Sequence, residues 1–350
     1  MWQNTIMNYK LFGKTGLRVS ELALGTMTFG TEWGYGADYN DSKDIFDFYA
    51  NADGNFIDTA NLYTNGSSEK YVGEFIARDR DHFVLSTKYT LRDSNADDRK
   101  QDPNYSGNHR KNLMRSVEAS LKRLNTSYID ILWLHAWDFY TPLDEILRGL
   151  NDLVSSGKVN YIGISDTPAW IVAEANTISH FRGWSAFAGL QIEYSLVQRS
   201  AERDLIPMAD HFGMTVTNWS PLAGGVLTGK YLNNEKGRHP VGSGKRTERN
   251  MNIAEAVVNI AKVYGYTPSQ VAIAFTRRNK LNTIPILGAR TLEQVQDCLG
   301  AATIELPTEA IMELESVSKI ELGFPHDFLN SKNVKDIVFS DMYGKIIQRN

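Results

Sequence analysis

The sequence predicts a closed (β/α)8 barrel, an α/β fold in which eight parallel strands each precede a helix. Eight short runs rich in Val, Ile, Leu and Phe alternate with amphipathic stretches along the 350 residues. Most of these runs do not alternate polar with apolar residues, which is typical of parallel strands buried on both faces. The first run ends in Leu24-Gly25-Thr26-Met27 and lacks the Gly-x-Gly-x-x-Gly turn typical of an open, doubly wound sheet. We therefore expect a TIM barrel.

The expected strands and helices follow one another in order. The strands are expected at 21–27, 55–59, 83–89, 128–136, 159–165, 189–194, 214–220 and 283–288. The helices are expected from 67 onward and at 41–52, 110–124, 142–157, 168–180, 201–212, 254–264, 269–278 and 292–300. Asp41 is a candidate N-cap of its helix. Pro142 near the start and Gly157 past the end indicate the bounds of another.

We expect one domain in three parts. A β-hairpin at about 8–20 would close the bottom of the barrel, the barrel would span about 21–305, and a C-terminal helix and tail would span about 306–350. Long loops at 91–109 and 230–250 are expected over the C-terminal face, because loops of this length are usually lids or binding loops. The tail contains Phe324, Phe328 and Phe339 and is expected to fold over the barrel mouth.

Composition limits the class of protein. A hydrophobic fraction of 42% with 22% charged residues is ordinary for a soluble protein. A net charge of −4 gives no reason to expect nucleic acid or an anionic membrane as a partner. The single cysteine, Cys298, excludes an intramolecular disulfide. With no signal-peptide pattern and no apolar run near the ~20 residues that span a bilayer, we expect a cytoplasmic location.

Four polar residues stand at or just after strand ends, where a barrel of this kind builds its active site. Asp58, Lys88 and His135 end three successive strand runs, and Tyr63 follows Asp58 by five residues. A lysine about 4 Å from a tyrosine favours the phenolate by roughly 4 kcal/mol, which would lower the tyrosine pKa by about three. Alone, Asp58 fits a turn cap and His135 fits a core histidine. Together the four predict an acid that protonates an alkoxide, with Asp58 holding Lys88 charged and His135 orienting a carbonyl.

The later strand ends suggest a large ligand that carries an amide and phosphates. Ser165, Asp166 and Gln191 match the donors and acceptors of a nicotinamide carboxamide, and Trp219 is suited to stacking on a planar ring. The cofactor residues expected here are completed by Gly25, Thr26, Met27, Ser220, Pro221, Leu222, Gly224, Lys230, Gly288, Ala289 and Arg290. The glycine-rich turn at 220–225 would offer N–H groups to a pyrophosphate. Arg290 before a helix suits a 2′-phosphate, and so NADP rather than NAD.

A basic loop is expected to close over this ligand, with a solvated surface loop as the alternative. Its cations are Lys236, Arg238, Lys245, Arg246 and Arg249.

These blocks resemble the aldo-keto reductase family, in particular its aryl-alcohol dehydrogenase-like branch. The resemblance is carried by Phe56-Ile57-Asp58-Thr59-Ala60-Asn61-Leu62-Tyr63, Leu85-Ser86-Thr87-Lys88, Asp130-Ile131-Leu132-Trp133-Leu134-His135, Gly163-Ile164-Ser165-Asp166, Gln191-Ile192-Glu193-Tyr194-Ser195, Trp219-Ser220-Pro221-Leu222 and Gly288-Ala289-Arg290-Thr291. It implies a barrel that binds NADP(H) without a metal, and a catalytic tetrad of Asp58, Tyr63, Lys88 and His135 with the tyrosine as general acid.

The resemblance also locates two departures from the family pattern. Asp166 stands where many members have asparagine, and an ionised aspartate would contact the carboxamide NH2. Cys298, after Asp297, stands where an asparagine usually meets the adenine, while Gln294 matches a cofactor-contacting position in the same helix. Substrate contacts are expected on position alone from Trp33, Tyr89 and Trp137.

The leading hypothesis is therefore an NADPH-dependent oxidoreductase that reduces a small-molecule aldehyde or ketone to an alcohol, reversibly. One alternative is an NADP(H)-binding, redox-sensing regulatory subunit with slow turnover, like the channel β subunits that share this fold. The last alternative is a metal-dependent barrel hydrolase or lyase, which the strand ends do not favour because they supply no ligand cluster.

Overall fold

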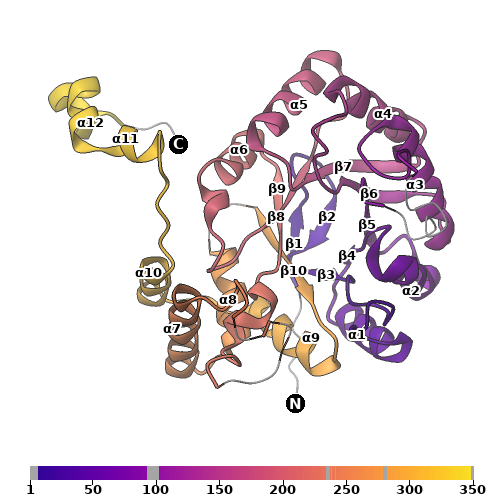
Figure 1. Cartoon of the computed structure of the whole chain (residues 1–350), viewed down its shortest axis with the longest axis horizontal. Helices are drawn as coiled ribbons and strands as arrows, with labels where there is room; N and C mark the ends of the chain where they lie inside the picture. The colour runs from indigo at the N-terminus through magenta and orange to yellow at the C-terminus, as the bar shows by residue number, and fades with distance from the viewer. Residues whose placement is uncertain are drawn as a thin grey trace.

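The computed structural model describes residues 7–92, 102–233, 237, 239–240, 242–278 and 282–347. Eight parallel strands close into a barrel in the order β10-β3-β4-β5-β6-β7-β8-β9, with helices around its outside (Figure 1). The strands are β3 Ala23–Gly25, β4 Phe56–Asp58, β5 Val84–Tyr89, β6 Ile129–Leu134, β7 Val159–Ser165, β8 Gly189–Glu193, β9 Thr215–Trp219 and β10 Thr283–Gly288. The predicted (β/α)8 barrel is confirmed, and each expected strand lies where the sequence predicts it.

The helices also match the prediction, with local differences. They are α1 Tyr39–Asn51, α2 Ser67–Ile76, α3 Arg110–Arg123, α4 Leu143–Ser155, α5 Ala169–Arg182, α6 Leu205–Phe212, α7 Glu248–Tyr264, α8 Pro268–Arg277, α9 Leu292–Leu299 and α10 Thr308–Val317. The N-cap prediction at Asp41 is wrong. Asp38 has the extended backbone of a cap and its carboxylate accepts the Asp41 N–H, so α1 begins two residues earlier. Residues 201–204 are not part of α6, because a separate 3-10 turn, Ser200–Glu202, precedes it.

The hairpin closes the bottom of the barrel, as predicted. Strands β1 Tyr9–Leu11 and β2 Arg18–Ser20 pair antiparallel. Phe12, the first residue of the turn between them, places its ring in the barrel interior. The Phe12 ring meets Phe56 and Trp133 edge to face, with centroids 6.1 and 6.0 Å apart. Gly189 makes this possible, because a Cβ there would lie 2.4 Å from the Phe12 ring and 2.8 Å from Trp133.

The strands divide their side chains between two cores. Residues that point inward join the interior cluster, with Val84, Ile131 and Trp133 among them. Their neighbours in sequence, such as Leu85 and Leu132, pack outward against the helices. This alternation is the period of two of a β-strand, and it determines which side chains reach the barrel mouth.

The tail does not fold over the mouth, so that prediction is wrong. After α10 the chain runs as an extended linker to α11 His326–Asn330, α12 Lys332–Phe339 and the 3-10 turn η7 Ser340–Lys345. These elements pack against one another and stand away from the barrel (Figure 1, yellow). The linker is held to the outside of the barrel, since Arg249 donates to the Ser318 carbonyl at 3.1 Å and Arg203 to the Glu321 carbonyl at 2.9 Å. Within the described residues no helix is long and apolar enough to cross a membrane.

Candidate active site

The centre of the site is a buried ion pair between two neighbouring strands. Asp58 ends β4 and Lys88 lies in β5, and both are almost completely buried. The Lys88 ammonium lies 2.5 Å from Asp58 Oδ2 and also donates to the Thr59 carbonyl at 2.8 Å. Burial alone would lower the pKa of Lys88, but the Asp58 carboxylate, with Tyr63, raises it above its usual value. Lys88 is therefore a fixed, permanent cation.

The second carboxylate oxygen of Asp58 is satisfied as well. Oδ1 accepts hydrogen bonds from the Ser86 hydroxyl at 2.7 Å and from the Gln191 amide at 3.2 Å. A buried pair with its remaining lone pairs bonded is the arrangement that makes such a pair tolerable inside a protein. Ser86 was missed by the sequence reasoning. Ser86 stands two residues before Lys88, so the two side chains lie on the same face of β5, and this spacing in the sequence could have identified it.

Tyr63 lies over the ion pair. The Lys88 Nζ is 4.8 Å from the centre of the phenol ring, and the imidazole of His135 is 6.0 Å away at 80°. Tyr63 is followed by two residues with left-handed backbone, Thr64 (φ 45°) and Asn65 (φ 54°), in the turn that precedes α2. Strained backbone conformations of this kind cluster at functional sites.

The pKa of Tyr63 differs from the sequence expectation. Burial raises it more than the charge and hydrogen bonding of Lys88 lower it, so the net direction is upward. The predicted fall by about three is therefore not seen. A neutral phenol results, which is the protonated form that a general acid requires.

His135 completes the predicted tetrad. Its backbone N–H is bonded to the Tyr89 carbonyl at 3.2 Å, just past the end of β6. Burial, and then the charge of Lys88, lower the pKa of His135 to about 3, so the imidazole is neutral at pH 7. Its Nδ1 is buried and has no hydrogen-bond partner among the described residues. The structure thus brings all four residues together around one point of the mouth.

The expected carboxamide group lies beside the tetrad, on β7 to β9. The Ser165 hydroxyl is buried with no partner in the described part of the chain, which leaves it available to a ligand. Trp219 donates its indole N–H to Asp166 at 3.2 Å. The Asp166 side chain is exposed, but desolvation by the surrounding protein raises its pKa to about 6, although the hydrogen bond from Trp219 acts in the opposite direction. Gln191 reaches across to Asp58 and so joins the two halves of the site.

The glycine-rich turn after β9 is less open than predicted. The N–H groups of Ala223 and Gly225 are bonded to the carbonyls of Ser220 and Leu222, so they are not free for a pyrophosphate. Gly224 (φ 65°) allows the close approach of His239, because a Cβ there would lie 2.3 Å from its imidazole. His239 is a residue that sequence reasoning missed. Pro221 is buried and Leu222 is half-buried. The Lys230 ammonium lies close to Gly225, because a Cβ added to that glycine would be only 2.8 Å from Lys230 Nζ.

The basic loop is partly tied down. Lys245 pairs with Glu193 at the end of β8, at 2.8 Å, and Arg246 and Arg249 donate to the Tyr231 and Val197 carbonyls. Lys236 and Arg238 lie outside the described residues.

The residues expected at the adenine end of the cofactor lie partly at the surface and partly in the core. Arg290 is exposed, and its backbone N–H donates to the Gln294 amide oxygen at 2.9 Å, so these two residues present a polar surface at the start of α9. Asp297 accepts the Thr267 hydroxyl at 2.6 Å and ties α9 to α8. Cys298 is buried in the core between helices and barrel, and burial raises the pKa of its thiol to about 12. Its predicted place at the adenine is therefore wrong, because its side chain points away from the surface.

The remaining predicted cofactor residues lie around the end of β3 and β10. Gly25 has no room for a side chain, since a Cβ would lie 2.6 Å from Ile286. Thr26 is buried and bonded to Ser68 at 2.7 Å, and Met27 is half-buried. Gly288 is exposed, while Ala289 is buried and accepts the Thr28 hydroxyl through its carbonyl.

The three predicted substrate residues differ in where they lie. Trp33 lies beside the tetrad, with its ring 6.4 Å from that of Tyr63. Tyr89 is completely buried in the outer core; as the neighbour of inward-pointing Lys88 it must point outward, so its predicted place at the mouth is wrong. Trp137 packs against the outer core and lines a cleft of about 620 Å³ between the loops after β5 and β6.

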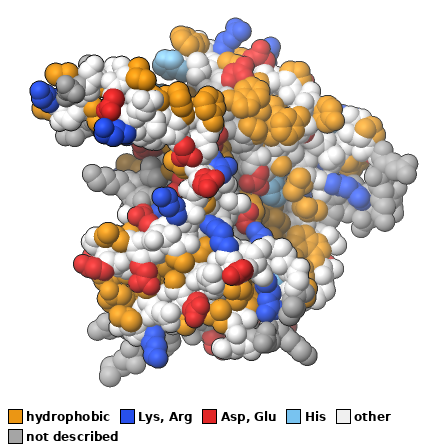
Figure 2. Space-filling model, turned by 60° about the vertical axis from the view of Figure 1, so that its left-hand side comes forward, with side chains coloured by type: hydrophobic (Ala, Val, Ile, Leu, Met, Phe, Trp, Pro, Cys, Tyr) orange, Lys and Arg blue, Asp and Glu red, His pale blue; other side chains and the backbone are white. Residues whose placement is uncertain are grey.

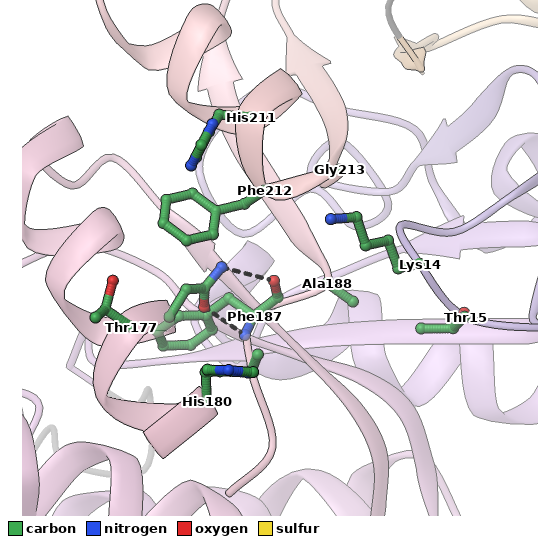
Figure 3. A pocket seen from close by; sticks show the side chains of 11 residues that line it. Lys14, Thr15, Thr177, His180, Phe187, Ala188, His211, Phe212 and Gly213 are labelled. Carbon is green, nitrogen blue, oxygen red and sulfur yellow. Dashed lines mark hydrogen bonds between the residues drawn. The ribbon is translucent and has the colours of Figure 1, made fainter. Parts of the chain in front are cut away.

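A second cleft, of about 490 Å³, lies at the opposite end of the barrel (Figure 3). It is formed by the hairpin turn and the C-terminal ends of α5 and α6, and Lys14, His180 and His211 line it. None of the tetrad residues reaches it, so it is not the candidate active site. Among the described residues no group of three or more His, Cys, Asp or Glu side chains could hold a metal ion.

Comparison with known proteins agrees with this geometry. The model of the aldo/keto reductase family matches residues 21–319, which cover the barrel, helix α10 and the first residues of the linker. The chain belongs to the aldo/keto reductase family. It is therefore an oxidoreductase, in a family that uses nicotinamide cofactors.

Named relatives place this aldo/keto reductase more closely. It is 37% identical over 332 residues to norsolorinic acid reductase of Aspergillus flavus, covering 93% of this chain and 85% of that protein. It is 37% identical over 339 residues to a Saccharomyces cerevisiae protein assigned as an aryl-alcohol dehydrogenase, covering 91% and 89%. An Emericella nidulans aldo-keto reductase is 37% identical over 333 residues, covering 91% and 83%. The resemblance to the aryl-alcohol dehydrogenase-like branch is thus confirmed.

Proposed function

We propose that this aldo/keto reductase reduces an aldehyde or ketone to an alcohol with NADPH, reversibly, with Tyr63 as the general acid. The observation that carries the proposal is the position of a neutral phenol between a fixed ammonium and a neutral imidazole. A carbonyl oxygen held at this point receives a proton from Tyr63. Lys88, 4.8 Å from the ring centre, stabilises the phenolate left behind, because charge that develops in a dry site is stabilised by preorganised charges.

Asp58 and His135 have supporting roles in this proposal. Asp58 keeps Lys88 charged and in place through the 2.5 Å contact. His135 is neutral, so it donates a hydrogen bond to the carbonyl oxygen without adding a second cation beside Lys88. When bound, the nicotinamide supplies the hydride.

The residues of the later strands fit NADP(H). The buried Ser165 hydroxyl, which has no partner among the described residues, would hold the carboxamide together with Asp166 and Gln191. Trp219 would stack on the nicotinamide ring. Lys230, beside the glycine-rich turn after β9, would face the pyrophosphate. Arg290 and Gln294, exposed together at the start of α9, would hold the 2′-phosphate.

Aromatic carbonyls are the first substrate class to test. Norsolorinic acid and aryl alcohols appear in the names of the relatives, and Trp33 presents an aromatic wall beside Tyr63 for stacking or edge contact.

Transfer of a labelled hydride tests this function. The purified chain is incubated with NADPH that carries deuterium at the transferable C4 position and with a panel of aromatic, aliphatic and sugar aldehydes and ketones. We expect NADPH consumption with at least one member, fastest for an aromatic carbonyl, and deuterium on the carbinol carbon of the product. NADPH that binds but is consumed with none of the panel would contradict the proposal and favour a cofactor-sensing subunit.

A further inference from the structure

The tail, residues 322–347, gathers exposed apolar side chains. Ten large apolar residues within it are exposed, among them Ile347 at 93%, Phe324 at 85% and Ile337 at 74%. Elsewhere in the described chain the exposed large apolar residues are scattered over the hairpin, the loops and several helices. Exposed apolar side chains concentrated in one segment in this way mark an interaction site. In Figure 2 orange side chains collect on the tail, near the top of the view.

The tail does not bury this surface by itself. Its ring contacts are local, between Phe324 and Phe328 at 6.0 Å and between Phe339 and Tyr343 at 5.3 Å. Helix α11 has five residues and α12 has eight, and helices this short are not stable alone in water. The apolar face of the tail therefore needs a surface that covers it.

The linker directs the tail away from its own barrel. Arg199 donates to the Ser318 hydroxyl at 2.9 Å, Arg249 to the Ser318 carbonyl and Arg203 to the Glu321 carbonyl. These bonds fix the chain to the barrel as far as residue 321, just before the tail begins. The tail is thus presented outward, at a fixed place on the molecule.

We propose that the tails of two copies of this chain pack against each other about a two-fold axis and form a dimer. A tail exposes roughly 1,000 Å² of apolar surface, taking about 150–250 Å² for a fully exposed aromatic side chain. Two such faces bury an area of the size that stable protein interfaces need. A two-fold contact between identical faces also closes on itself, so association stops at the dimer.

The charges of the tail suit a second copy rather than a membrane. Lys332, Lys335 and Lys345 balance Asp327, Asp336 and Asp341, so two tails do not repel each other. A membrane-binding segment would need an excess of positive charge to hold an anionic lipid surface, and the tail has none.

Molar mass in solution tests the dimer. The full chain, measured by light scattering after size exclusion at micromolar concentration, is expected at twice its mass of 39.4 kDa. A variant that ends at Leu322 is expected at the mass of one chain, with its far-ultraviolet spectrum and NADPH turnover retained. A monomeric full chain, or a shortened chain that still dimerises, overturns the proposal.

Point variants separate the apolar face from a general effect of the tail. Ile337→Lys places a charge in the face and is expected to give monomers. Asp336→Asn shifts the charge of α12 by the same one unit at an exposed position that points away from Ile337, because adjacent helix residues point about 100° apart, and it is expected to leave the dimer intact. Equal loss of dimer in both variants contradicts the assigned face.

Crosslinking locates the contact, since the only cysteine, Cys298, is buried. Ile337→Cys with a short bismaleimide is expected to yield a covalent dimer, whereas Glu174→Cys on the outside of α5 is not. A tail that folds back onto its own barrel, or that sediments with anionic vesicles as a monomer, would give no such product and would overturn the proposal.

Discussion

At the scale of single residues, two side chains carry most of the chemical argument besides Tyr63. His135 is neutral because burial, and then the positive charge of Lys88, lower the pKa of its imidazole. Arg290 is the exposed cation at the start of α9, where the N-terminus of a helix and a guanidinium together favour a phosphate. Each role has a measurable consequence.

His135 should make the fold sensitive to acid. Its folded pKa of about 3 lies below the usual 6.5, so the unfolded chain binds a proton that the folded chain does not, and stability falls as pH drops below about 6.5. Between pH 7.5 and pH 5.0 we expect wild type to lose about 1–2 kcal/mol more unfolding free energy than His135→Gln. Urea unfolding at the two pH values measures this. Parallel losses in the two proteins would refute the neutral imidazole.

Arg290 should decide between the two nicotinamide cofactors. Losing a charge-assisted contact of about 1.5–3 kcal/mol predicts that Arg290→Ala weakens NADPH binding by roughly 10–100-fold and leaves NADH binding nearly unchanged. Arg182→Ala, on another exposed arginine, is the matched control. Fluorescence titration with both cofactors measures the effect; equal losses for NADPH and NADH would exclude the 2′-phosphate role.

At the scale of elements, the strand ends and the hairpin make the site. Asp58, Lys88 and His135 could be found in the sequence because each follows an apolar run, and parallel strands bring such ends to one face. The position of Tyr89 near a strand end predicts the mouth, but the alternation along β5 places it elsewhere: Ser86 and Lys88 point inward, so Thr87 and Tyr89 point outward. The pKa of Tyr63 depends on burial more than on its attraction to Lys88, and residue spacing does not reveal how deeply a side chain is buried.

The hairpin's fit into the barrel depends on a glycine. Gly189→Ala puts a Cβ 2.4 Å from the Phe12 ring, and overpacking of this kind typically costs about 1–3 kcal/mol. Gly16→Ala, in the hairpin turn where nothing lies within 4 Å of the new Cβ, should change stability little. Chemical denaturation compares the two. If Gly189→Ala is as stable as wild type, Phe12 is not packed as described.

At the scale of the whole molecule, the barrel follows from local patterns but the tail does not. The eight apolar runs predict eight strands, and each strand pairs with the next one along the chain until β10 closes onto β3. The apolar residues of the tail show that it has a face to cover, yet their spacing does not specify what covers it. Phe324, Phe328 and Phe339 fit a cover over the mouth by composition alone, whereas the arginines that hold the linker direct the tail elsewhere.

The central claim is that Tyr63 gives the proton in NADPH-dependent carbonyl reduction, and Tyr63→Phe tests it most directly. General acid catalysis by a positioned side chain is typically worth about 10²–10⁴-fold. We predict that single-turnover oxidation of bound NADPH by the best carbonyl of the panel slows by that factor, while the NADPH dissociation constant stays within about twofold, because the phenol hydroxyl is not part of the proposed cofactor site. A Tyr63→Phe enzyme that turns over near the wild-type rate would contradict the account.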